Sequence, residues 1–126
     1  MITVSEQLAD IPKAVQPTVG AAIKAVRRAA PNAEEIPYQM RKPRSERMMW
    51  KIARYAVDGV NVVGVGTFPS HSAIFFYRGR ELDDGAGLLK GSGKDTRFIT
   101  LRSPADARSP VVSDLLRRAF ILASRG

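Results

Sequence analysis

Two stretches of the chain, one near each end, carry apolar residues at helical spacing. In residues 13–30 the apolar positions recur every three or four residues, with cations and amides largely on the other side. They are Val15, Val19, Ala22, Ile23, Val26 and Ala30. Residues 109–125 repeat the pattern after Ser109-Pro110, a pair typical of a helix start. We therefore predict two long helices, and a short helical turn over residues 4–9.

The segment between these helices has the pattern of antiparallel strands. Asp58-Gly59 is a strong signal for a two-residue hairpin turn, and β-branched residues are frequent after it. The predicted strands are 50–57, 60–68, 73–77 and 96–101. Gly64 and Gly66 inside the second strand indicate a bulge or a close backbone approach. Residues 35–40 fit either a short strand or a mobile basic loop.

The order helix, strands, helix predicts one domain over residues 1–126. We expect an α+β sandwich of two layers, in which the N- and C-terminal helices pack on one face of an antiparallel sheet of about 4–6 strands. Neighbouring residues on a strand point to opposite faces, so either Phe75 or Phe76 faces away from the helices. If that face is bare, it is a ligand surface or a homodimer interface, and we favour the homodimer.

Composition narrows the class of protein. A 44% share of hydrophobic residues among 126 is enough for a core. The absence of cysteine excludes disulfides, thiolate metal sites and cysteine nucleophiles. Residues 1–6 lack the cationic head and apolar run of a secretory signal, and no stretch is long and apolar enough for a bilayer, so we expect a cytoplasmic protein with no membrane partner.

The net charge of +8, from 20 basic and 12 acidic residues, attracts anions such as phosphates, nucleic acid or acidic proteins. Two clusters of cations are candidate anion-binding sites. The first, here called the glycine loop, covers residues 90–97 with Lys90, Gly91, Ser92, Gly93, Lys94 and Arg97. The second, here called the basic segment, covers residues 41–47 with Arg41, Lys42, Arg44 and Arg47.

Successive N–H groups in a glycine turn can form an anion-binding nest, and the cations of the glycine loop would then neutralise the bound charge. The spacing is not that of a P-loop, because Leu88 stands where the first glycine is needed and Asp95 follows Lys94. The alternative is a purely structural turn that leads into the last strand. For the basic segment the alternative is a solvated surface loop.

Chemistry other than anion binding has few candidates in the sequence. His71, Asp83 and Asp84 are weak metal-ligand candidates, and each also fits a turn without a ligand. Six aromatic residues could stack on single-stranded nucleic acid, namely Trp50, Tyr55, Phe68, Phe75, Phe76 and Tyr77. No nucleophile with an acid/base partner emerges, so we do not expect an enzyme.

Residues 87–102, Gly-Leu-Leu-Lys-Gly-Ser-Gly-Lys-Asp-Thr-Arg-Phe-Ile-Thr-Leu-Arg, resemble the C-terminal signature of the YdhG-like family of small bacterial proteins. Ala29-Ala30-Pro31, the hairpin at Asp58-Gly59 and His71 also resemble the family pattern. The family's Trp-Gly-Met-Pro motif is not kept in residues 36–53.

The resemblance implies a frataxin-like fold and, for some members, an iron chaperone. Iron prefers clustered carboxylates, whereas the acids of this chain are scattered. We therefore expect a non-enzymatic binding module for an anionic ligand or acidic partner, acting through the glycine loop and the basic segment. The alternatives are a frataxin-like iron chaperone, the one case in which a cofactor is expected, and a nucleic-acid-binding protein.

Overall fold

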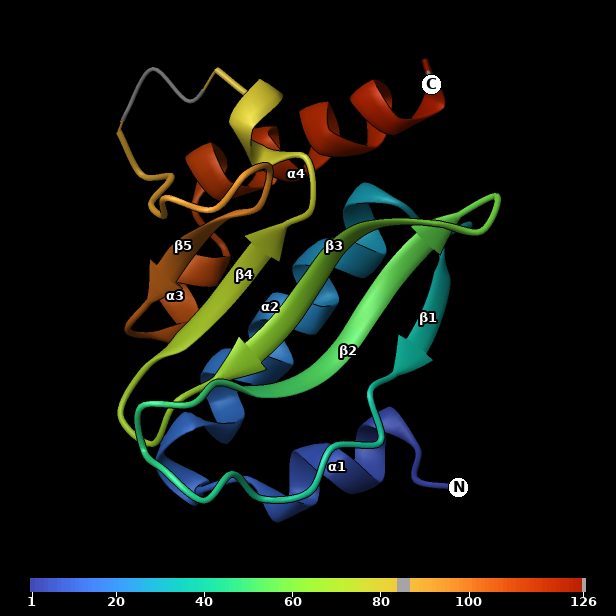
Figure 1. Ribbon diagram of the computed structural model, residues 1–126. Helices are drawn as coiled ribbons and strands as arrows, with labels where there is room; N and C mark the ends of the chain where they lie inside the picture. Colours follow the sequence, from blue (N-terminus) through green and yellow to red (C-terminus); the bar gives the residue numbers. More distant parts are fainter. Residues whose placement is uncertain (84–86, 126) are drawn as a thin grey trace.

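The computed structural model describes residues 1–83 and 87–125 (Figure 1). Its helical elements are α1 (Val4–Asp10), η1 (Lys13–Val15), α2 (Gln16–Ala29), η2 (Gly79–Glu81), α3 (Pro104–Ala107) and α4 (Pro110–Ser124). Its strands are β1 (Glu34–Pro37), β2 (Trp50–Val57), β3 (Val60–Thr67), β4 (Ser72–Phe76) and β5 (Arg97–Leu101). The five strands form one antiparallel sheet in the order of the sequence.

Proline decides where the long helices begin. The helix predicted over residues 13–30 starts as the 3-10 turn η1 and becomes α-helical only at Gln16. Pro17 explains this, because deeper in a helix its ring would clash with the preceding turn. α4 begins as predicted, with the Ser109 hydroxyl accepting the Val112 N–H. None of the helices in the described residues combines the length and hydrophobicity needed to cross a membrane.

The hairpin predicted at Asp58-Gly59 is confirmed. These residues have φ of 51° and 78°, the positive values that a type I′ turn needs. β2 and β3 pair antiparallel on either side of the turn, with register shifts between Lys51 and Ala53 and between Tyr55 and Ala56.

Two short elements go beyond the sequence prediction. Residues 34–37 form the edge strand β1. Of the two alternatives predicted for this region, a strand or a loop, the strand is therefore found, and it ends at Pro37. α3 was not predicted. The Ser103 hydroxyl accepts the Asp106 N–H, and the Asp106 carboxylate accepts the Arg102 N–H at 2.8 Å. These bonds cap the start of α3.

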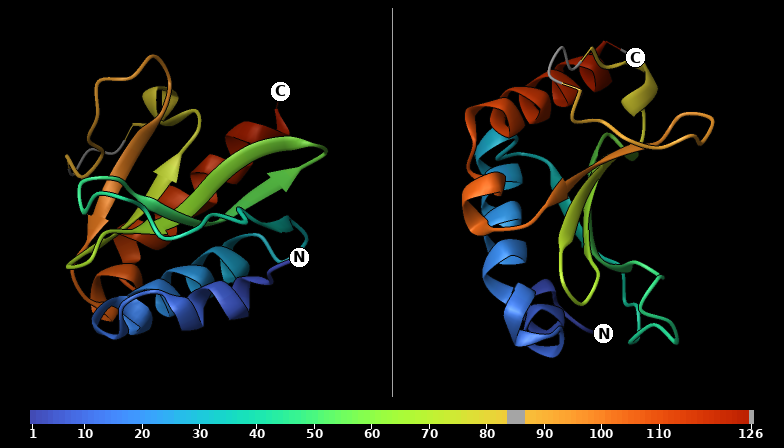
Figure 2. Two further views of the ribbon diagram at one scale, coloured as in Figure 1. Left: turned by 60° about the horizontal axis from the view of Figure 1, so that its bottom comes forward. Right: turned by 90° about the vertical axis from the view of Figure 1, so that its left-hand side faces the viewer.

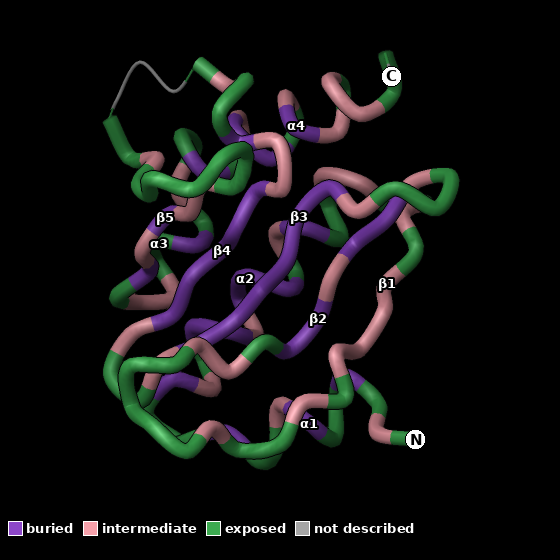
Figure 3. The backbone as a smooth tube through the Cα atoms, in the orientation of Figure 1, coloured by how far each residue is buried: buried purple, intermediate pink, exposed green. Residues whose placement is uncertain are grey.

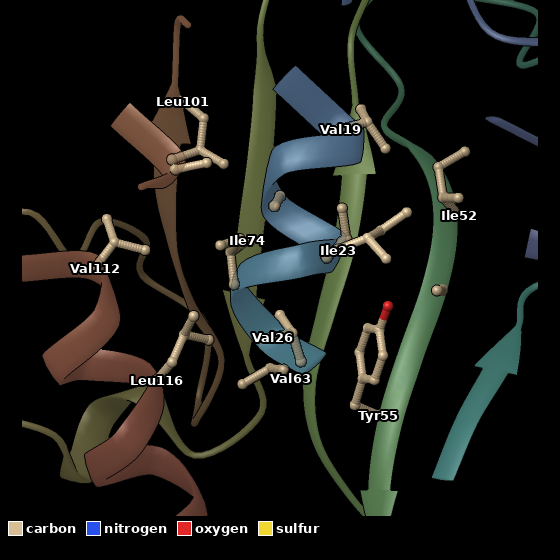
Figure 4. Packing of buried hydrophobic residues seen from close by; sticks show 14 of the residues in the cluster. Val19, Ile23, Val26, Ile52, Tyr55, Val63, Ile74, Leu101, Val112 and Leu116 are labelled. Carbon is tan, nitrogen blue, oxygen red and sulfur yellow. The ribbon is translucent and has the colours of Figure 1, made fainter. Parts of the chain in front are cut away.

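The helices cover one face of the sheet, as the predicted two-layer sandwich requires; Figure 2 shows α1, α2 and α4 on the same side of the strands. Figure 4 shows the core between the layers, where Ile23 and Val26 of α2 lie close to Val63 and Ile74 of the sheet. Each such buried side chain contributes about 1.5–3 kcal/mol. The central strands are buried along most of their length (Figure 3).

The face opposite the helices is covered in part by the chain itself. Phe75 lies on this face, and Phe76 lies in the core. Phe75 is nevertheless only 5% exposed. Its ring lies over Gly64, where an added Cβ would come within 2.2 Å of it, and Met49 covers Gly66 in the same way. The prediction for these glycines was a bulge or a close backbone approach, and the groups that approach them are side chains. The bare face on which the homodimer prediction depended is not found at Phe75.

Candidate anion-binding site

A cavity of about 370 Å³ lies at the end of the sheet where β2 begins and β3 ends. Its walls come from the loop that joins β1 to β2, from the turn between β3 and β4, and from Pro12. Trp50 and Phe68 supply aromatic surface, and Lys42 and Arg44 supply positive charge. The volume is within the range of small-molecule sites in proteins.

The loop of residues 38–49 runs along the lower edge of the sheet (Figure 1), and hydrogen bonds of its side chains and backbone hold it in place. Gln39 has a positive φ of 60°. Its side-chain amide accepts the Ile2 N–H at 2.7 Å and donates to the Ile2 carbonyl at 2.6 Å. The Trp50 indole N–H donates to the Met40 carbonyl at 3.2 Å. The loop is therefore held at two points, by Ile2 near the N-terminus of the chain and by Trp50 at the start of β2.

The two cations of the cavity are available for a ligand. Lys42 and Arg44 are exposed, and neither has an ion-pair partner among the described residues. The Thr67 hydroxyl is bonded inside the β3–β4 turn, and the Ser45 hydroxyl accepts an N–H of its own turn. Glu46 adds one carboxylate to the lining. The cavity thus suits an anion.

The structure places two of the four predicted cations of the basic segment at this cavity. Arg41 and Arg47 are exposed in the same loop but do not line it. Trp50 and Phe68 were aromatic candidates from the sequence, but their place beside the basic segment was not predicted, because they are 18 positions apart and reach one cavity through the pairing of β2 with β3.

In the glycine loop, the arginine side chain binds carbonyl groups of the loop itself. The Arg97 guanidinium donates to the carbonyls of Gly93 and Thr96 at 2.6 and 2.9 Å. Lys90 pairs through its backbone with Phe98, and Gly91 has a φ of 120°. Ser92 and Lys94 are exposed, and the Arg80 guanidinium donates to the Lys94 carbonyl at 3.4 Å. Arg97 therefore supports the turn.

The glycine loop and the basic segment do not form one site. The basic segment lies at the lower end of the sheet in Figure 1, and the glycine loop lies beyond the opposite end of β4. The five residues of β4 span about 15 Å. Both loops nevertheless extend to the side opposite the helices, as the right-hand view of Figure 2 shows.

Between the two loops lies an aromatic cluster that joins Phe75 and Tyr77, two of the aromatic candidates from the sequence, to Tyr38, which was not among them. The Tyr38 and Tyr77 hydroxyls are hydrogen-bonded, and both rings lie near Phe75, at centroid distances of 6.3 and 5.7 Å. Lys51 and Arg54 lie over the Tyr38 ring at 5.5 and 5.4 Å. Burial and the hydrogen bond to Tyr38 raise the pKa of Tyr77, so the Tyr77 hydroxyl stays protonated at neutral pH.

The metal candidates are not brought together. The His71 ring stacks on Phe68 at 4.8 Å, with Nδ1 3.4 Å from the Ser70 hydroxyl. The Asp83 carbonyl accepts a bond from Arg118, and Asp84 lies outside the described residues. Across residues 1–83 and 87–125 there is no group of three or more His, Asp or Glu side chains that could hold a metal ion.

Glu35, one of the acids that an iron site would need, has other partners. It accepts two bonds from Arg27 at 2.7 and 2.8 Å and one from the buried Tyr55 hydroxyl at 2.8 Å. The hydrogen bonds from Arg27 lower the pKa of Glu35, with the Tyr55 bond adding to the effect. This carboxylate therefore joins α2 to β1 and β2.

Comparison of the chain with protein-family models, with curated proteins and with solved structures gives no match.

Proposed function

We propose that this chain is a non-enzymatic binding module, acting in the cytoplasm, that binds an anionic ligand in the cavity beside the basic segment. The observation that carries the proposal is the pair Lys42 and Arg44 on the wall of a cavity of ligand size, two cations that have no ion-pair partner in the part of the chain that the structure describes. Residues 38–54 contain six cations and one carboxylate, so the field around the cavity is positive.

An NMR titration tests this function, because Trp50 is the only tryptophan and its indole N–H gives a single resolved signal at the cavity. The probes are inorganic phosphate and 2-naphthoate at low salt. We expect at least one anion to shift the Trp50 indole and the amides of residues 41–48. The double variant Lys42→Gln/Arg44→Gln should weaken that binding about tenfold or more, which corresponds to about 1.4 kcal/mol.

The matched control is Lys24→Gln/Arg28→Gln, which removes the same charge from exposed positions on α2, in the other layer of the fold. This control should leave the affinity within about twofold, since exposed charges farther away than about 10 Å are screened at moderate salt. Absence of any shift at Trp50 with both probes would refute the proposed function. Equal weakening by the two double variants would show that net charge alone is responsible.

A second candidate is the binding of an extended polyanion such as single-stranded nucleic acid. It is favoured by the two cationic loops on the same side of the sheet, with Lys51 and Arg54 between them. Affinity should then fall steeply with added salt. Lys90→Gln/Lys94→Gln should weaken binding as much as Lys42→Gln/Arg44→Gln. An electrophoretic shift assay that shows no complex at low salt would exclude this candidate.

Membership of the YdhG-like family is part of the proposal. It is supported by the order helix, antiparallel sheet, helix, and by the glycine turn before β5. The iron-chaperone alternative has no cluster of carboxylates within the described residues to support it. Calorimetric titration with Fe(II) tests that alternative, which requires micromolar binding that is lost in Glu34→Gln/Glu35→Gln.

A further inference from the structure

The cavity beside the basic segment is apolar over most of its lining, and its charged residues are two cations, Lys42 and Arg44, and one carboxylate, Glu46. The apolar lining residues are Pro12, Pro43, Met48, Trp50, Phe68 and Pro69. A bare inorganic anion would be attracted by the two cations but would leave the apolar residues without a contact. Exposed ion pairs gain little in water, whereas the gain from apolar contact grows with the area removed from water. The lining therefore favours a ligand with an apolar body.

The aromatic walls are held in place before any ligand binds. Trp50 is fixed by its indole bond to the Met40 carbonyl. Phe68 stacks on His71, and its N–H donates to the His71 carbonyl at 2.8 Å. A ligand between preformed walls does not have to order them, which avoids a common entropic cost of binding. Met48, which is 52% exposed, is a flexible apolar side chain able to adapt to the ligand.

The charges of the lining set the charge of the ligand. Lys42 and Arg44 attract one anionic head group, and Glu46 on the same lining repels a second. A dianion or a polyphosphate would place negative charge near that carboxylate. The volume of about 370 Å³ is at the lower end of the range for ligand pockets, which fits a body of one or two rings or a short acyl chain.

We propose that the ligand of this cavity is an amphiphilic organic monoanion. Its carboxylate, or a similar single anionic head, lies at Lys42 and Arg44, and its apolar body lies against Trp50 and Phe68. This inference rests on the proposed function of the cavity and adds the chemical class of the ligand.

Three probes separate the contribution of the head from that of the body. 2-Naphthoate carries both, acetate carries the head without the body, and 2-naphthalenemethanol carries the body without the charge. Dissociation constants come from NMR titrations that follow the Trp50 indole N–H. We expect 2-naphthoate to bind at least tenfold more tightly than either acetate or the alcohol.

Two variants test which residues provide the affinity for the anionic head and for the apolar body. Lys42→Gln/Arg44→Gln should reduce the affinity for 2-naphthoate to that of the alcohol, and Lys24→Gln/Arg28→Gln should leave it unchanged. Phe68→Leu should weaken 2-naphthoate binding several-fold and leave acetate binding unchanged. If the Phe68→Leu spectrum shows loss of folding, the comparison of the three probes on the wild-type chain decides the question.

Each outcome identifies which idea fails. Equal affinity for acetate and 2-naphthoate would overturn the amphiphilic ligand and leave the anion site standing. Equal affinity for the alcohol and 2-naphthoate would overturn both, because charge would then contribute nothing. If neither 2-naphthoate nor phosphate shifts Trp50, the proposed function fails and the ligand class fails with it.

Discussion

The basic segment and the glycine loop are both cationic, yet the fold uses their charges differently. In the basic segment Lys42 and Arg44 reach a cavity and have no ion-pair partner among the described residues. In the glycine loop Arg97 donates to two carbonyls of its own turn. A cluster of cations in a sequence therefore does not define a binding site. The fold decides whether each cation stabilises the backbone or remains available to a ligand.

Backbone geometry explains the difference. The turn at Gly91 and Gly93 leaves carbonyls near Arg97, and a guanidinium with several donors can bond two of them at once. The loop of residues 38–49 instead crosses the end of the sheet in an irregular path and contains Pro43, which has no N–H to donate. Its side chains and the β3–β4 turn leave a hollow between them.

The largest expected effect concerns Gly91 and tests whether the glycine loop is structural. Its φ of 120° is one that residues with a Cβ rarely adopt, whereas a Cβ there would find only ordinary contacts at 3.5 Å or more. Gly91→Ala should therefore lower the free energy of unfolding by about 1–3 kcal/mol through backbone strain. Urea denaturation measures the change, with Ser92→Ala as the control. An unchanged midpoint for Gly91→Ala would mean that the turn is not held in this conformation.

A pair of arginine substitutions gives the next effect. Arg97→Met keeps much of the apolar stem but removes the donors to Gly93 and Thr96, and should cost about 0.5–1.5 kcal/mol. Arg44→Met removes a cation that makes no hydrogen bond within the described residues, and should stay within about 0.5 kcal/mol of the wild type. Thermal unfolding of both variants compares the two segments. A larger loss for Arg44→Met than for Arg97→Met would reverse the comparison.

The smallest effect is on the pH dependence of stability, which neither cationic segment should control. Hydrogen bonds from Arg27 lower the pKa of Glu35 in the folded state, so its contribution is present above the pKa of an unfolded Glu. That contribution is lost as the pH falls through the folded value. Unfolding measured between about pH 6 and pH 3 should therefore show a shallower loss of stability for Glu35→Gln than for the wild type.

Lys42→Gln/Arg44→Gln serves as the comparison variant for that measurement. It should keep the wild-type pH profile, since neither cation contacts Glu35. A Glu35→Gln profile that follows the wild type at every pH would show that the contact between α2 and β1 adds no pH-dependent stability.

Local sequence signals predicted most of the fold. Asp58-Gly59 set the central hairpin, and Ser109-Pro110 set the start of α4, because both depend on neighbouring residues alone. The start of α2 was misplaced by three residues, since Pro17 was not weighed against the apolar pattern. α3 was missed although Ser103-Pro104 repeats the Ser-Pro start of α4, because a helix of four residues is too short to show an apolar periodicity.

The candidate site was only half predicted, for a related reason. The cations of the basic segment are adjacent in sequence and visible as a cluster. The aromatic walls and the Tyr38–Tyr77 contact join residues far apart in the chain, the latter pair by 39 positions. Such contacts depend on which residues of paired strands lie opposite each other. A single sequence does not show directly which loop will lie beside the end of a given strand.

One NMR spectrum tests the contrast between the two segments most directly. Backbone amides of residues 41–48, the Trp50 indole and residues 90–97 are followed in the same titration with 2-naphthoate. We predict saturable shifts at residues 41–48 and Trp50, with residues 90–97 unaffected. Shifts centred on residues 90–97, with Trp50 unchanged, would contradict the assignment of ligand binding to the basic segment and of a structural role to the glycine loop.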